Sequence, residues 1–338
     1  MKLMNILPFE FSDEIVNLIA EITERVVILE GNQRLENNLH LRKRSRIQTV
    51  KSTTAIENNT LSYKQITDVI NGKLVVGGKK EIAEVKNTFN AYEKISDYHP
   101  YNIKSFLKAH FLVTESLLPS AGKFRDGDVG VIEGQKVIHL GARSQFVHGL
   151  IEELFSWAKT TDSHPLIVSA VVHLEIETIH PFEDGNGRLG RLWQTTILSK
   201  WKSIFEYIPI ETIVYKYQKD YYKAIEESRN EGLSNKFIVF MLKAISETLV
   251  SMEDIHLTDI VTEKLSKIEN EVLESIIKYL LKYETIDNSK AQEITGKGTE
   301  SIKKYLSKFV KLNLLIPIGE NKGRKYKLNK QVLKDTIQ

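Results

Sequence analysis

The sequence predicts a mainly α-helical protein with one β-hairpin, followed by a small C-terminal winged helix-turn-helix domain. Apolar residues recur at three- and four-residue steps through most of the 338 residues, which is the period of an amphipathic helix. The stretch 122–140 instead alternates apolar and polar residues, as a strand pair does. The last quarter of the chain has an order of helices and strands of its own.

The length allows two or three domains. We expect an N-terminal helical region over 1–95, a helical core over 96–250, a linker over 251–266 and the winged-helix domain over 267–338. The linker is placed where the sequence is polar and lacks a clear apolar face.

Composition excludes several kinds of chemistry. The chain has no cysteine, which rules out disulfides, thiolate metal sites and cysteine nucleophiles. No window approaches the ~20 apolar residues of a membrane-spanning helix, and acidic residues interrupt the N-terminus before any long apolar run. We therefore expect a cytoplasmic protein that does not enter a membrane.

The C-terminal quarter differs from the rest in charge. Residues 264–338 hold 16 Lys and Arg against 9 Asp and Glu, whereas the remainder of the chain is mildly acidic. A helix, a short helix, a tight turn at Gly296, a longer helix and two strands follow one another there, which is the order of a winged helix. Its lysines suit DNA phosphates, but few side chains are suited to reading bases, so the partner could be DNA or a protein.

One segment, residues 179–193, differs from the helical stretches on both sides. It reads IHPFEDGNGRLGRLW. Glycines that open a helix leave backbone N–H groups aimed at one spot, which favours an anion. Arg188 and Arg191 can reach the same side and suit phosphate oxygens. Asp184 is the type of ligand that Mg²⁺ takes when it bridges phosphates, and His180 can accept a proton near neutral pH. This pattern indicates group transfer from a polyphosphate.

A purely structural explanation also accounts for part of this pattern. Gly-Asn-Gly turns between helices are common, and the arginines could simply pair with Glu183 or Asp184 at the surface. The concentration of charged groups and glycines in so short a stretch favours the functional interpretation. The segment contains neither a GxxxxGK[ST] loop nor an HExxH zinc motif, and we expect His173 to be a packed helix residue.

HPFEDGNGRLGR, residues 180–191, resembles the signature of the Fic family, His-Pro-Phe-x-Asp/Glu-Gly-Asn-Gly-Arg-x-x-Arg, at every specified position. The resemblance implies a Fic-type helical core with nucleotidyltransferase activity. Such enzymes transfer AMP from ATP to a Ser, Thr or Tyr hydroxyl of a target protein and release pyrophosphate. It further implies that His180 deprotonates the hydroxyl, that Asp184 holds Mg²⁺ on the α- and β-phosphates, and that Arg191 reaches the γ-phosphate of the co-substrate ATP.

Two further stretches resemble parts of this family. GKFR (122–125) with VGVIEG (129–134) resembles the flap hairpin, whose edge would align the target protein by strand addition, although the usual prolines after the flap are absent. DYYKAIEESRNEG (220–232) resembles the segment that lines the adenine pocket. The nucleotide-binding residues implied are Glu57, Val131, Ile132, Glu133, Gly134, Asp184, Gly185, Asn186, Gly187, Arg188, Leu189, Gly190, Arg191, Tyr222 and Asn230.

A last match lies in VKSTTAIENNTLS, residues 50–62. Thr53-x-x-x-Glu57-Asn58 resembles the inhibitory motif of the family, Ser/Thr-x-x-x-Glu-Gly/Asn. The resemblance implies that Glu57 pairs with Arg191 and so occupies the arginine that the γ-phosphate needs.

The expected function is therefore that of an autoinhibited protein adenylyltransferase. In one alternative the protein is still a Fic-type enzyme, but it removes AMP or transfers another phosphate-containing group. Another is a DNA-binding regulator that only senses a nucleotide. A homodimer, the target protein and the signal that relieves inhibition are left open by the sequence.

Overall fold

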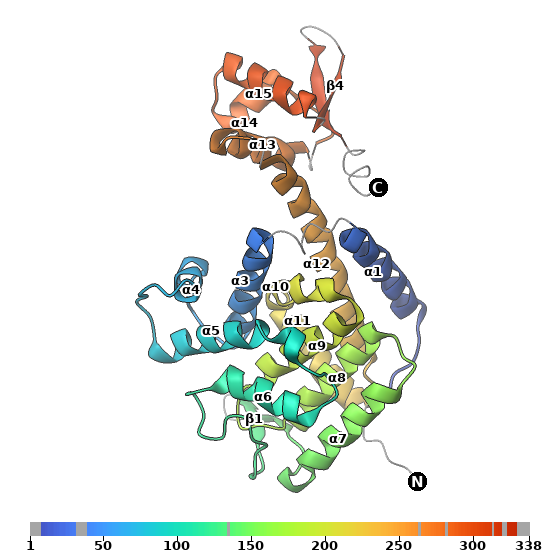
Figure 1. Ribbon diagram of the computed structural model, residues 1–338. Coiled ribbons are helices and arrows are strands. Elements are labelled where there is room, and N and C mark those ends of the chain that lie inside the picture. Colours follow the sequence, from blue (N-terminus) through green and yellow to red (C-terminus); the bar gives the residue numbers. More distant parts are fainter. Residues whose placement is uncertain are drawn as a thin grey trace. The chain divides into compact units, whose positions relative to one another are not determined.

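The computed structural model describes residues 8–31, 39–133, 136–262, 265–280, 283–312, 314–319 and 323–329. The chain divides into two compact units, Met1–Leu249 and Val250–Gln338. Both are built mainly from helices, so the predicted mainly α fold class is confirmed (Figure 1). No helix of the described part is both long and apolar enough to cross a membrane.

The N-terminal helices begin with α1 (Asp13–Gly31) and α3 (Leu39–Ile56). Next come α4 (Tyr63–Ile70) and α5 (Lys79–Tyr92). Ser62 and Gln65 form a reciprocal capping box that starts α4. Apolar side chains of α3, α4 and α5 form one buried cluster, and it fixes α3, which carries Thr53, against its neighbours.

The central helices enclose an aromatic core. They are η1 (Ile95–Asp97), α6 (Ile103–Thr114), α7 (Ser144–Thr160), α8 (Pro165–Ile179) and α9 (Asn186–Trp201). Phe106, Phe155, Phe182 and Trp193 are buried together between them. α8 is apolar on nearly every side, which fits its burial among the other helices. The short loop between α8 and α9 is the predicted signature segment.

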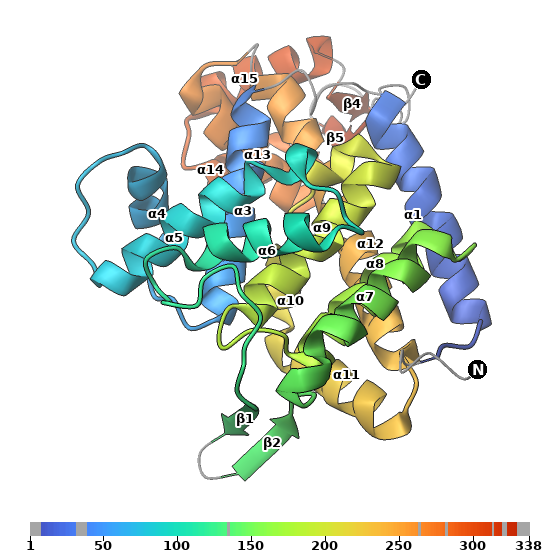
Figure 2. The ribbon, with the colours of Figure 1, turned by 60° about the horizontal axis from the view of Figure 1, so that its bottom comes forward.

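The predicted hairpin is formed by β1 (Gly130–Glu133) and β2 (Lys136–Leu140), which pair antiparallel. It extends from the helices of the N-terminal unit (Figure 2). The remaining elements of that unit are η2 (Ser203–Tyr207), α10 (Glu211–Lys216), α11 (Gln218–Glu231) and the first part of α12 (Asn235–Thr262). Most of the stretch expected as a linker, 251–262, is helical and continues α12.

The C-terminal unit contains α13 (Lys267–Leu280), α14 (Asn288–Thr295) and α15 (Thr299–Lys311). A three-stranded antiparallel sheet has the order β3 (Ile286–Asp287), β5 (Lys325–Leu328), β4 (Leu315–Ile318). Gly296 ends α14 with a φ of 64°, a conformation that favours glycine, so the turn was placed correctly from the sequence. The winged-helix assignment itself stays a prediction.

Candidate active site

The loop between α8 and α9 starts at His180, which adopts a left-handed conformation with φ 53° and ψ 62°. That conformation is strained for a residue other than glycine, so neighbouring groups must hold it. Arg125 does so from the base of the hairpin. Its Nε donates to the His180 carbonyl at 2.7 Å, and its other nitrogens donate to the carbonyls of Gly127, Ala142 and Ile179. The buried Arg125 thus ties the hairpin to the loop.

Glycine at the hairpin base allows this close approach. A Cβ on Gly141 would lie 3.0 Å from the Arg125 guanidinium and 3.2 Å from the His180 Cβ. The Gly141 N–H donates to the Val129 carbonyl at 3.0 Å. The replacement of the family's usual prolines is therefore compatible with an ordered hairpin base.

Phe182 anchors the middle of the loop in the core. Its ring is fully buried and stacks on the His110 ring, with centroids 3.6 Å apart. The Asn186 side chain accepts from the Phe182 N–H at 3.0 Å and donates to the Phe182 carbonyl at 2.9 Å. His110 Nε2 lies 3.0 Å from the Asp184 carbonyl. These contacts leave the backbone of the turn with little freedom.

The start of α9 has the features of an anion site. Gly185 is its N-cap, with φ 85°, and no side chain caps the helix. Arg188 in the first turn is 3% exposed. Its Nε and NH1 are buried without a hydrogen-bond acceptor among the described residues, and NH1 lies 3.7 Å from Glu84 Oε1. Buried guanidinium N–H groups without an acceptor are costly, so this position favours a phosphate ligand.

Asp184 lies at the mouth of this site with a side chain that is 50% exposed. Its Oδ1 accepts from the Gly185 N–H at 2.6 Å and lies 3.3 Å from Arg188 NH2. The described residues contain no cluster of three or more metal-ligating side chains. A single accessible carboxylate next to a phosphate site fits Mg²⁺, which usually takes one or two protein carboxylates and completes its shell with phosphates and water.

Glu57 and Arg191 meet in the structure. Arg191 NH2 donates to Glu57 Oε1 at 2.6 Å, and the two side chains are 2% and 30% exposed. Arg191 also donates to Thr53, from Nε to Oγ1 at 2.8 Å and from NH2 to the carbonyl at 3.2 Å. Burial works to lower the pKa of Arg191, but Glu57 and other neighbours hold that pKa above its ordinary value.

Asn58 explains how Glu57 reaches this position. Its φ of 67° turns the chain out of the helical path directly after Glu57. Asparagine and glycine tolerate this conformation best, which gives a physical reason for the Gly/Asn position of the inhibitory motif. The buried Asn59 then donates to Glu84 Oε2 at 3.0 Å and fixes the chain after the turn.

The predicted adenine-binding residues lie on α11, two turns apart. Tyr222 and Asn230 are both exposed, and the Tyr222 hydroxyl donates to the Ile56 carbonyl at 3.4 Å, beside Glu57. Tyr221, next to Tyr222, is fully buried and therefore has a packing role. In the hairpin, Val131, Ile132 and Glu133 lie on β1, whereas the predicted contact Gly134 is outside the described residues.

Leu189 and Gly190 lie within α9, away from its first N–H groups. The Leu189 side chain is fully buried in the aromatic core. A Cβ on Gly190 would lie 2.7 Å from His173 Cδ2, so this glycine allows α8 and α9 to pack closely. The environments of both residues indicate packing roles rather than side-chain contact with a nucleotide.

Several residues of the site were not assigned a role from the sequence. Arg125, His110 and Glu177 belong to this group, because each acts through contacts with segments distant in the chain. The sequence indicates these residues only weakly. Arg125 is the last residue of GKFR (122–125), and Glu177 precedes the signature by one helical turn.

Known proteins resemble this chain in sequence and in fold. Residues 100–198 match the model of the Fic/DOC family. The crystal structure of a Fic family protein from Desulfovibrio desulfuricans G20 is 31% identical, with a TM-score of 0.69 over 95% of this chain and 97% of that one. Fic-1 (residues 134–508) from C. elegans, 21% identical, has a TM-score of 0.58 over 72% and 74% of the two chains, and shows the same fold.

The chain therefore belongs to the Fic family. Among curated relatives, the protein adenylyltransferase Fic of Drosophila ananassae is 28% identical over 218 residues, and that of Aedes aegypti is 27% identical over 220 residues. These matches cover 62% and 61% of this chain, but only 42% of each relative.

Proposed function

We propose that the protein transfers AMP from ATP to a hydroxyl group of a target protein. The observation that carries this proposal is the buried Arg188, whose Nε and NH1 have no acceptor among the described residues, beside the uncapped start of α9 and the Asp184 carboxylate. A phosphate chain with its Mg²⁺ would satisfy these groups together. The names of the curated relatives support the same reaction.

In this reaction the target hydroxyl oxygen attacks the α-phosphorus of ATP. The bond between that phosphorus and the oxygen that bridges to the β-phosphate breaks, and pyrophosphate leaves. His180, held at the start of the loop by Arg125, would take the hydroxyl proton. Bound Mg²⁺, held by Asp184, would neutralise charge on the phosphates. Ser, Thr and Tyr side chains are the proposed acceptors, and the edge of the hairpin is the proposed docking strand.

We also propose that Glu57 inhibits this activity. The carboxylate that bonds to Arg191 occupies the guanidinium that would otherwise bind the γ-phosphate. ATP would then bind weakly, or with its α-phosphate poorly aligned for attack. Relief of the inhibition requires only that Glu57 leave Arg191.

The test is incubation of the wild type, Glu57→Gly and Glu57→Gly/His180→Ala with Mg²⁺ and ATP labelled at either the α- or the γ-phosphate. AMP transfer predicts that α-label, but not γ-label, enters protein with Glu57→Gly, and that His180→Ala abolishes it. Incorporation of γ-label would indicate phosphoryl transfer instead. Faster loss of AMP from a pre-labelled protein with the wild type than without enzyme would favour the alternative of AMP removal.

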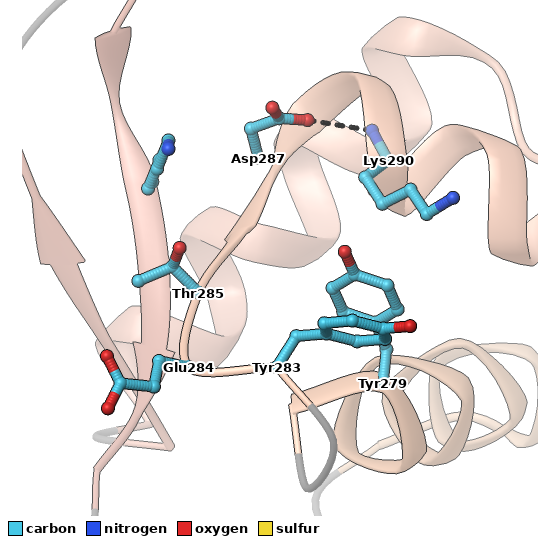
Figure 3. Close-up of a pocket in the computed structure, with 7 residues that line it drawn as sticks. Tyr279, Tyr283, Glu284, Thr285, Asp287 and Lys290 are labelled. Atoms are coloured by element: carbon cyan, nitrogen blue, oxygen red, sulfur yellow. Dashed lines mark hydrogen bonds between the residues drawn. The ribbon is translucent and has the colours of Figure 1, made fainter.

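We propose a second function, the binding of a macromolecule by the C-terminal unit. Lys303 and Lys304 on α15 are exposed, whereas Lys308 bonds to Glu269 at 2.8 Å. A separate hollow of about 500 Å³ combines aromatic and cationic groups (Figure 3). It is lined by Tyr279, Tyr283, Glu284, Thr285, Asp287, Lys290 and Lys325. We propose a winged-helix domain that docks DNA or a protein, and salt-dependent binding of a labelled duplex would separate the two.

We also propose a cytoplasmic location and domain limits at 95, 250 and 266. A homodimer is an open alternative. The lack of cysteine supports a reducing compartment.

A further inference from the structure

A second carboxylate, Glu177, lies at the place where Glu57 meets Arg191. Its position can be given relative to Gly187. A Cβ added to Gly187 would lie 2.6 Å from Glu57 Oε1, 3.3 Å from Arg191 NH1 and 3.3 Å from Glu177 Oε1. The carboxylates of Glu57 and Glu177 and the guanidinium of Arg191 therefore all approach the same side of the Gly187 backbone. Glu177 is on α8, one turn before His180, with a side chain that is 12% exposed.

The two carboxylates belong to different parts of the protein. The hydrogen bonds described for the Arg191 guanidinium all go to residues 53 and 57, in and just after α3. Glu177 is on α8, which the signature loop joins to α9. When Glu57 leaves Arg191, Glu177 stays on this side of α9, with its Oε1 and Arg191 NH1 each 3.3 Å from the position of a Cβ on Gly187.

Glu177 is held in place by contacts that do not involve α3. The Tyr221 hydroxyl donates to Glu177 Oε1 at 3.3 Å and lies 3.0 Å from His173 Nε2. His173 Nδ1 in turn lies 2.7 Å from Gln194 Oε1. The backbone is fixed by Arg229, whose NH2 donates to the Glu177 carbonyl at 2.6 Å. Such a chain of buried hydrogen bonds restricts the carboxylate to one orientation.

The charges at this point also favour a functional role. Burial raises the pKa of Glu177, while Arg191 works against that rise and Glu57 adds to it. Removal of Glu57 therefore takes away a repelling neighbour and leaves Glu177 and Arg191 together. Without Glu57, Arg191 keeps its two hydrogen bonds to Thr53 and has further N–H donors for a phosphate.

We propose that Glu177 is a positioning residue that orients Arg191 toward the γ-phosphate once Glu57 has withdrawn. The proposal rests on the proposed function, because it assumes that Arg191 binds the terminal phosphate of ATP. According to this proposal, Glu177 is the reason why the enzyme binds ATP more tightly than ADP once the Glu57–Arg191 bond is broken. The residue would touch neither the nucleotide nor the acceptor hydroxyl.

The test compares the affinities of ATP and ADP, since ADP lacks the γ-phosphate. Dissociation constants are measured by calorimetry with Mg²⁺ in Glu57→Gly/His180→Ala, which releases Arg191 and prevents turnover, and in the same protein with Glu177→Gln added. We expect Glu177→Gln to reduce the preference for ATP over ADP roughly tenfold, the scale of one charge-assisted hydrogen bond, and to leave ADP affinity within about twofold.

Glu175→Gln in the same background is the matched control. Glu175 is on the same helix, is 3% exposed, and lies two residues from Glu177 in the helical path. It should leave the ratio of ATP to ADP affinity unchanged. If Glu177→Gln does not fold, Tyr221→Phe removes the hydroxyl that lies between Glu177 and His173 and should shift the ratio in the same direction by less.

Two results would overturn the proposal. One is an unchanged ratio in Glu177→Gln, and the other is an equal loss of ATP and ADP affinity, which would indicate general loosening of the site. Failure of the proposed function is recognised separately, because Glu57→Gly with His180 intact would then incorporate no α-label. Incorporation of label together with an unchanged ratio would refute only the role of Glu177.

Discussion

Glu57→Gly is the change that most directly tests how this site is controlled. The bond that it removes joins Arg191 NH2 to Glu57 Oε1 at 2.6 Å, with side chains 2% and 30% exposed. A hydrogen bond to a charged group contributes ~1.5–3 kcal/mol, whereas a fully exposed ion pair contributes only ~0–1 kcal/mol. The partial exposure of Glu57 places this pair between those limits, at about 2 kcal/mol.

Because 1.4 kcal/mol corresponds to a factor of ten, loss of the bond to Glu57 should raise AMP transfer roughly 30-fold when ATP is below saturation. The two hydrogen bonds from Arg191 to Thr53 remain in Glu57→Gly, so the gain reflects the carboxylate rather than loss of α3. Glu57→Gln, which keeps the length of the side chain and removes its charge, should give a smaller increase.

The assay is incorporation of α-label into protein by the wild type, Glu57→Gly, Arg191→Ala and Glu57→Gly/Arg191→Ala at equal concentration. The double variant should lose most of the gain, because the freed arginine is what raises activity. Equal rates for the wild type and Glu57→Gly would refute the inhibitory contact. High activity in the double variant would show that Glu57 acts through something other than Arg191.

Three further predictions follow from the same site. His180→Ala should bind ATP with Mg²⁺ as the wild type does, while AMP transfer falls ~10²–10⁴-fold in a labelling assay; normal transfer would exclude His180 as the base. Asp184→Ala should weaken ATP binding most at limiting Mg²⁺, as measured by calorimetry across a Mg²⁺ titration, and full affinity there would contradict a metal role. Lowering the pH from 6.5 toward 4 should reduce the Tm, because burial lowers the pKa of His110 to about 4 and that of His173 to about 3. The unfolded chain then binds protons that the folded chain does not, so stability is lost as the pH falls; His173→Gln should make Tm less dependent on pH, and an unchanged slope would argue against this origin.

Local patterns were enough to predict much of this protein. The helical period, the alternation around 130–140 and the glycine at 296 each depend on neighbouring residues, and the structure has helices, a hairpin and a turn at these places. The residues of the signature also lie together, because a single loop and the helix that follows it carry them.

Contacts between distant segments could not be derived in the same way. Arg125 reaches the His180 carbonyl across 55 positions, and His110 approaches Asp184 across 74. Nothing in the local sequence around Arg125 or His110 specifies these partners. The pairing of Glu57 with Arg191, 134 positions apart, was expected only through the resemblance of two short motifs to a family.

Gly187 is adjacent both to the Glu57–Arg191 pair and to the proposed binding position of the ATP phosphates. Its missing side chain leaves room for Glu57 Oε1, which would lie only 2.6 Å from a Cβ at that position. The same residue is in the first turn of α9, whose N–H groups are the proposed phosphate cradle. The Glu57 carboxylate thus occupies space directly beside the N–H groups of the proposed phosphate cradle. Two anions cannot share that space without strong repulsion, so bound ATP in its productive position and the Glu57–Arg191 bond should exclude each other.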